Sequence, residues 1–305
     1  MKSKGKITLL IIAISFIAIG IAIIWGLNAY YSSVETIDYN AFGTFGDFFG
    51  GLIGTIFAII GVFYVYFTYK NQITSQEKGE IENRFFELLN LHNQNALNLK
   101  SIESDIFNIY IKFINNFNKA ISDYKAKHKT NWNQEDIVKL SYLYFFYGYN
   151  NIFAEKLKGV KLSIVDIVDL NAYLEENGYV YNPAYKDFGI YFRQLYQIVV
   201  YINEKKVLTY KEKYNYIKIL RVRLNIEEQY LLFLNSFIAS GRNWEFDQTF
   251  INDKFITKYN LIKNIPKEYP QIIGLDFRVE YPNVFYEFQG NEKSDERKKL
   301  ELNYK

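Results

Sequence analysis

The apolar residues of this chain are concentrated near its N-terminus. No charged residue occurs between Ile7 and Val34, and a second uncharged run extends from Phe48 to Tyr69. An α-helix rises about 1.5 Å per residue, so roughly 20 residues cross the apolar core of a bilayer. Both runs are long enough. The pattern therefore predicts a membrane anchor over residues 1–70, with two transmembrane helices at about 7–30 and 46–69.

The charges that flank these runs predict the orientation of the anchor. Lysines precede the first run and Lys70 follows the second, whereas the connection between them contains only acidic charges, Glu35 and Asp38. Because Lys and Arg accumulate on the cytoplasmic side, we expect a multi-pass protein with both termini in the cytoplasm. A secretory signal peptide is the alternative, but the first apolar run is too long and lacks a small-residue cleavage site.

Small residues form a stripe along the second predicted span. They recur at every fourth position and so share one face of a helix: Gly46, Gly50, Gly54 and Ala58. Small residues at this spacing let another helix approach closely in lipid. Two interpretations stay open, since the stripe could pack against the first span of the same chain or join several chains in a homo-oligomer.

Asp47 lies at the outer end of the second span. A carboxylate at the membrane is a candidate functional group for ion or proton movement. The alternative is structural, because Thr44 and Asp47 have the spacing of a capping box that would begin the helix at this point.

Beyond the anchor the chain has the pattern of an amphipathic helical protein. A polar neck, 71–80, is expected to continue the second span with an interruption near Gly79. Apolar residues at three- and four-residue spacing then predict helices at 81–99, 106–121, 134–147, 188–201, 211–223 and 227–239, the last closed by Gly241. No strand alternation or hairpin signal occurs, so the fold class is all-α, with 272–279 as the one segment that could be extended. The helical cytoplasmic domain comprises residues 81–290, and the charged tail, 291–305, is expected to be a solvated helix or disordered.

Composition excludes most enzymatic chemistry. The chain has no Cys and 2 His, which excludes a thiol nucleophile and a Cys-ligated metal and leaves little for a His-rich centre. We expect neither a metal nor another cofactor. The charges of residues 1–69 cancel, so the net charge of +3 belongs to residues 70–305. This charge is too small for a protein that coats nucleic acid, and nucleic acid is not an expected partner.

His92 is the one histidine on a predicted apolar helix face. It is either a general base or, as is commoner, a packed histidine. A helical ribonuclease of the HEPN type would need a closer Arg upstream, because Arg84 and His92 are separated by seven residues. The chain also lacks a P-loop, a Rossmann fingerprint and the G-x-S-x-G and H-E-x-x-H motifs.

The arginines of the domain are candidates for binding an anionic partner. Arg193, Arg221 and Arg223 could form a basic site for a nucleotide, a lipid phosphate or another anionic partner. Alternatively, they pair with nearby carboxylates, those of Asp187, Glu227 and Glu228, as structural salt bridges. Glu228 and Asn235 share a helix face and could meet Arg221 in a buried polar network.

Four stretches of the sequence, 42–51, 85–93, 191–196 and 220–235, resemble the bacterial phage abortive infection proteins of the AbiC type. The resemblance implies a defence protein of the inner (cytoplasmic) membrane that halts or kills the infected cell. It supplies no catalytic residues. We therefore expect an anti-phage protein whose cytoplasmic domain senses a phage-derived trigger and whose membrane hairpin acts on the lipid bilayer. The alternatives are a membrane-tethered nuclease or nucleotide-processing effector, and a receptor that recruits another toxin.

Overall fold

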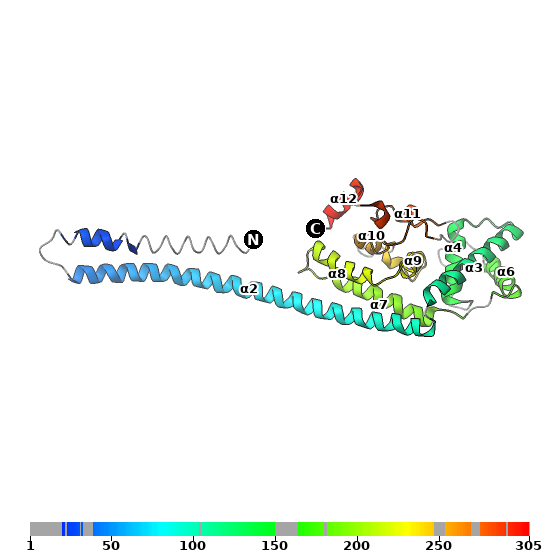
Figure 1. Cartoon of the computed structure of the whole chain (residues 1–305), viewed down its shortest axis with the longest axis horizontal. Helices are drawn as coiled ribbons and strands as arrows, with labels where there is room; N and C mark the ends of the chain where they lie inside the picture. The colour runs from blue at the N-terminus through cyan, green and yellow to red at the C-terminus, as the bar shows by residue number, and fades with distance from the viewer. Residues whose placement is uncertain are drawn as a thin grey trace. The chain divides into compact units, whose positions relative to one another are not determined.

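A computed structural model describes residues 20–21, 23–30, 32, 39–103, 105–149, 164–179, 182–246, 254–269, 275–290 and 292–304. The regular elements within these ranges are all helices (Figure 1). The chain divides into two compact units, Met1–Ile73 and Thr74–Lys305. The boundary falls within helix α2, Tyr39–Ile102. The expected all-helical fold is confirmed.

The N-terminal unit contains the apolar part of α2. Among the described residues, α2 is the one helix that is long and apolar enough to cross a membrane, as judged by length and composition. Its apolar side chains are exposed, for example Val62 at 70% and Phe63 at 59%. Residues 7–19 of the first predicted span lie outside the described residues, while 20–21 and 23–30 are helical. The described residues thus support one membrane helix and do not confirm the two-helix, multi-pass arrangement.

Helix α2 differs from the predicted span at both ends. It begins at Tyr39, so Thr44 and Asp47 lie inside it and do not cap it. The Thr44 hydroxyl instead donates to the Asn40 carbonyl at 2.8 Å, one turn earlier in the same helix. The capping interpretation is therefore wrong. The helix also continues through Gly79, and the interruption expected in the neck is absent.

The second unit consists of the last turns of α2 followed by short helices. They are α3 (Ile106–His128), α4 (Gln134–Tyr147), α6 (Ile164–Glu176), α7 (Tyr185–Asn203), α8 (Tyr210–Val222), α9 (Ile226–Asn235), α10 (Phe255–Tyr259), α11 (Phe277–Glu280), α12 (Asp295–Asn303) and the 3-10 turns η1 (Arg242–Trp244) and η2 (Glu287–Gln289). The prediction for 134–147 matches α4 at both ends. Helix α6 is not among the predicted helices, and the extended segment proposed for 272–279 is wrong at Phe277–Val279, which begin α11.

Capping boxes fix where three of these helices begin. In each, the first side chain accepts a hydrogen bond from a backbone N–H three residues later, and the later carboxylate accepts one in return. The pairs are Asn133 with Asp136 in α4, Thr209 with Glu212 in α8, and Asn225 with Glu228 in α9. Each cap is worth about 1 kcal/mol, so these starts are encoded locally.

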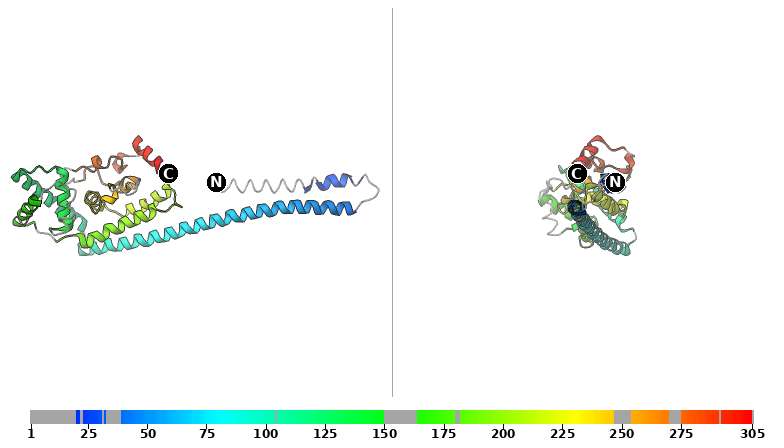
Figure 2. Two further views of the ribbon diagram at one scale, coloured as in Figure 1. Left: turned by 180° about the vertical axis from the view of Figure 1, so that it is seen from behind. Right: turned by 90° about the vertical axis from the view of Figure 1, so that its left-hand side faces the viewer.

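The core of the second unit is rich in aromatic side chains. Helix α3 packs against α4, α6 and α9, and α7 packs against α4 and α8. The last turns of α2 run beside α7 and α8 (Figures 1 and 2), where Phe85 meets Tyr216 with ring centroids 5.0 Å apart. The aromatic run 142–147 is buried throughout and forms part of this core.

The charged tail is tied to this core by Arg297. This residue of α12 is 1% exposed, and its guanidinium group donates to the backbone carbonyls of Thr257, Lys258 and Asn283. Its Nε also lies 3.0 Å from Glu301. The tail is therefore neither disordered nor merely solvated over α12, because one long side chain anchors it.

Candidate functional site

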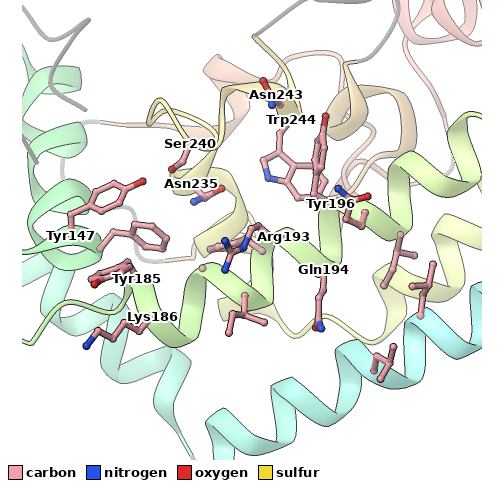
Figure 3. Close-up of a pocket in the computed structure, with 18 residues that line it drawn as sticks. Tyr147, Tyr185, Lys186, Arg193, Gln194, Tyr196, Asn235, Ser240, Asn243 and Trp244 are labelled. Carbon is pink, nitrogen blue, oxygen red and sulfur yellow. The ribbon is translucent and has the colours of Figure 1, made fainter. Parts of the chain in front are cut away.

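A groove of about 820 Å³ lies beside α7 in the helical unit (Figure 3). One wall is the face of α7, and the facing wall is the end of α9 with the turn and η1 that follow it. Helices α2 and α4 add mainly apolar side chains, Leu88, Leu91, Phe146 and Tyr147. The volume is within the range of small-molecule sites, about 300 to 1,000 Å³.

Arg193 and Lys186 give this groove a positive charge. Both side chains are exposed, and neither side chain has a hydrogen bond or ion pair with another described residue. Among the described residues that line the groove there is no Asp or Glu. In Figure 3 Arg193 lies in the middle of the site, between Tyr185 on one side and Tyr196 on the other. The guanidinium fork is therefore available for an anionic group.

The wall opposite α7 presents neutral hydrogen-bonding groups. Asn235, Ser240 and Asn243 all line the groove. Asn235 is 3% exposed, and its Nδ2 donates to the Tyr142 hydroxyl at 3.1 Å. Burial raises the pKa of Tyr142, so this hydroxyl stays protonated. The bond joins the groove wall to the aromatic core and fixes the side chain of Asn235.

Gly241 lets the chain turn back onto the end of α9. A Cβ at this position would lie 1.9 Å from the carbonyl oxygen of Asn235 and 2.5 Å from its Oδ1. The φ angle is −107°, an ordinary value, so the requirement for glycine is steric. The predicted role of Gly241 in ending this helical segment fits this geometry, although α9 itself ends at Asn235.

His92 is buried and is not among the described residues that line the groove. It is 2% exposed, and its ring centroid is 4.6 Å from that of Tyr191. Burial lowers the pKa of His92 to about 4, so the imidazole is neutral near pH 7. Its Nδ1 has no hydrogen-bond partner among the described residues. A general base must reach a substrate proton, so this geometry favours the packing interpretation.

Glu228 and Arg221 are both buried but do not meet. Glu228 caps α9, and its Oε1 lies 3.8 Å from Lys100 Nζ. Burial raises the pKa of its carboxyl group. Arg221 Nη1 instead donates to the carbonyls of Tyr259 and Asn260, both at 3.1 Å. The single polar network predicted from Glu228, Asn235 and Arg221 is therefore not formed.

The three arginines are separated rather than gathered into one basic site. Arg193 lies in the groove, Arg221 is 4% exposed and bonded to backbone, and Arg223 is exposed at the end of α8 outside the groove lining. The guanidinium of Arg221 also lies 5.9 Å from the ring centroid of Tyr214. Of the three, Arg193 keeps the geometry of a ligand-binding residue.

The remaining predicted residues belong to the N-terminal unit. Asp47, Gly46, Gly50, Gly54 and Ala58 are all exposed on α2. A Cβ at any of the three glycines would have no described atom within 4 Å. Their roles in helix packing, and that of Asp47, therefore remain predictions.

Residues 184–270 match the family model described as "Putative phage abortive infection protein". The model is that of the AbiC-type family, and it covers less than half of the chain. The resemblance seen in the sequence motifs is thus confirmed over this segment. No curated protein and no solved structure matches the chain.

The matched segment contains most of the groove. All of its cationic residues and most of its polar ones fall between Tyr185 and Trp244, inside the matched range. Sequence reasoning found Arg193 and Asn235 but missed Lys186, Asn243 and Trp244. One signal was available for this face, since Gly189 is a glycine in the middle of an otherwise regular amphipathic helix.

Proposed function

We propose that this protein defends bacteria against phage by abortive infection from the inner membrane. In this proposal the helical domain senses infection on the cytoplasmic side, and the membrane helices are the effector that disturbs the bilayer. The match of residues 184–270 to the abortive infection family carries the proposal. The exposed apolar stretch of α2 supports the membrane part.

The groove beside α7 is the candidate sensing site. It lies in the matched segment, and its cationic side chains have no partner among the residues that the structure describes. Arg193→Ala is therefore expected to weaken protection while the protein still accumulates in the membrane.

The effector role is tested by paired substitutions on α2. Gly50 belongs to the predicted small-residue stripe, and Gly51 lies about 100° away around the helix. A Cβ added at either glycine would have no described atom within 4 Å. Gly50→Leu would block close approach of a second helix, whereas Gly51→Leu adds the same bulk on another face.

The experiment records membrane potential and phage yield together in infected cells. Cells with the wild-type protein or Gly51→Leu should lose membrane potential before phage release, and cells with Gly50→Leu should keep it and release phage. Unchanged potential in wild-type cells that stop growing would contradict the membrane effector. RNA integrity in the same culture reports on a nuclease, and loss of protection without the neighbouring genes would indicate a recruiting receptor.

A further inference from the structure

The face of α7 that lines the groove combines aromatic and cationic side chains, which suit different parts of a ligand. Tyr185, Gly189, Arg193 and Tyr196 are spaced at three and four residues, so they share one side of the helix. Tyr185 and Tyr196 are half-buried, and both line the groove at either end of this face. Each ring packs against another aromatic ring of the groove. Tyr185 stacks with Tyr147, and Tyr196 meets Trp244 edge to face at a centroid distance of 5.0 Å.

Gly189 leaves a hollow in this face of α7 between the side chains of Lys186 and Arg193. Glycine is the least favourable residue in a helix interior apart from proline. Sterics do not require it here, because an added Cβ would contact only Phe146 Cζ at 3.7 Å, an ordinary van der Waals distance. Packing of the helix therefore does not require glycine here, and the missing side chain leaves the groove deeper at this point.

The charges are spread along the helix rather than focused on one point. Lys186 and Arg193 are separated by about 10 Å along the axis at 1.5 Å per residue. This separation favours a ligand with several anionic groups over a single phosphate or carboxylate. The half-buried tyrosines and the amides of Asn235 and Asn243 fit a planar, hydrogen-bonding ring system.

We propose that the groove binds a nucleotide with more than one phosphate group. Arg193 and Lys186 contact the phosphates, and the base lies against a tyrosine ring with its edge toward the wall that carries Asn235 and Asn243. This assignment of a ligand class rests on the proposed function of the groove as the sensing site. The groove volume, about 820 Å³, is within the range of small-molecule sites, whereas an acidic peptide would need a longer groove or a free strand edge.

Isothermal titration calorimetry on the full-length protein in detergent tests the assignment. The probes are ATP, GTP, CTP and UTP, with tripolyphosphate and adenosine as the separated parts and hexaglutamate as the acidic peptide. At least one nucleoside triphosphate should bind with a Kd below about 100 µM, and tighter than tripolyphosphate, adenosine or hexaglutamate.

Substitutions then locate the binding site. Arg193→Ala should weaken binding at least about tenfold because it removes a charge-assisted contact. Gly189→Leu should abolish binding by filling the groove, with the far-UV circular dichroism unchanged. Arg223→Ala removes an exposed arginine outside the lining and should leave the Kd within about twofold.

Three results would overturn the assignment: no nucleotide binds the wild-type protein, Arg193→Ala binds like Arg223→Ala, or a probe other than a nucleotide binds tightest. The binding assay contains no phage and no membrane potential, so it fails separately from the proposed function. Absent binding with normal collapse of the potential in infected cells would refute the ligand class alone. Normal binding with an unchanged potential would refute the membrane effector alone.

Discussion

Helix α2 contains two stretches that place apolar side chains in opposite surroundings. In the N-terminal stretch Val62 and Phe63 are 70% and 59% exposed, whereas Phe85 and Leu89, further along the helix, are both 0% exposed. The first stretch is apolar on all sides. The second buries apolar residues at three- and four-residue spacing, and most of its other positions are polar.

This contrast is the one expected of a helix that passes from lipid into water, as we propose for α2. A helix that is hydrophobic all round needs lipid or a protein partner on every side, while an amphipathic one needs a partner on one face. The second stretch has its partner, since it buries Phe85 against Tyr216 of α8. Val62 and Phe63 of the first stretch stay exposed, as expected for apolar side chains that face lipid.

The largest expected effect is a loss of stability in the second unit, caused by adding one methyl group. Gly241→Ala would bring Cβ to 1.9 Å from the Asn235 carbonyl oxygen, so the turn after α9 must open. We expect a loss of more than about 4 kcal/mol in the free energy of unfolding. Gly54→Ala is the matched control, since nothing described lies within 4 Å of its added Cβ. Unfolding in denaturant is monitored by tryptophan fluorescence. Equal unfolding midpoints for the two variants would contradict the distinction between the two regions.

A charged residue should separate the two stretches of α2 directly. Ile59 and Leu97 are both exposed, at 52% and 65%. Ile59→Lys places a charge in the apolar stretch and should disfavour membrane insertion by about 3 kcal/mol. Leu97→Lys places the same charge on a surface that faces water and should change stability by less than about 0.5 kcal/mol.

The absence of cysteine makes insertion simple to follow. Because the chain has no Cys, Leu302→Cys provides a single reporter in α12. In spheroplasts this thiol should be protected from an impermeant maleimide. With the first predicted span still inserted, Ile59→Lys should carry the C-terminal unit across the membrane and expose the thiol. Labelling that is the same with Ile59→Lys and Leu97→Lys would show that the apolar stretch does not cross the membrane.

The stability of the second unit should depend on pH through two buried groups that have opposite effects. Burial raises the pKa of Glu245 to about 7 from 4.5, although the carboxylate accepts hydrogen bonds from Thr257. The folded state therefore holds its proton more tightly than the unfolded state. Stability from this group is present below pH 4.5 and is lost as pH rises through 7, by on the order of 3 kcal/mol. Glu245→Gln should remove this loss, as measured by urea unfolding at pH 5 and pH 8.

His92 gives the opposite slope. Its pKa is lowered to about 4 from 6.5, so its contribution is present above pH 6.5 and is lost as pH falls toward 4. Between pH 4.5 and 6.5 the two slopes partly cancel in the wild-type protein. His92→Leu should therefore make stability fall with rising pH across that window, and Glu245→Gln should make it rise. The same slope in both variants would show that other groups control the titration.

Most of the predicted helices follow from local features of the sequence, namely capping boxes and the spacing of apolar residues. Helix α4 begins at a capping box and has regular apolar spacing, so both of its ends follow from the pattern over 134–147. Helix α6 escapes prediction because its start is rich in β-branched residues, which favour strands. Its buried residues Ile167, Leu170 and Leu174 nevertheless have helical spacing.

The site itself depends on contacts that no local signal contains. The groove joins α7 to the turn after α9, and Asn95 of α2 bonds Gln194 across 99 residues of sequence. Arg193 can be selected as a candidate from the sequence, but its neighbours Asn243 and Trp244 follow from the fold alone. The anchoring role of Arg297 escapes prediction for the same reason, since its backbone acceptors lie up to 40 residues away.

The smallest expected effect concerns the helix that carries the groove. Gly189→Ala should stabilise the helical unit by about 1 kcal/mol, because alanine is the best helix former and the added Cβ has room, 3.7 Å from Phe146 Cζ. The same methyl group makes the groove shallower between Lys186 and Arg193. Unfolding in urea should therefore show a higher midpoint while protection against phage falls. Gly79→Ala, also inside a helix and with open space around it, should raise stability similarly and leave protection intact. Loss of protection with both variants would mean that helix rigidity, and not the shape of the groove, is what the glycine controls.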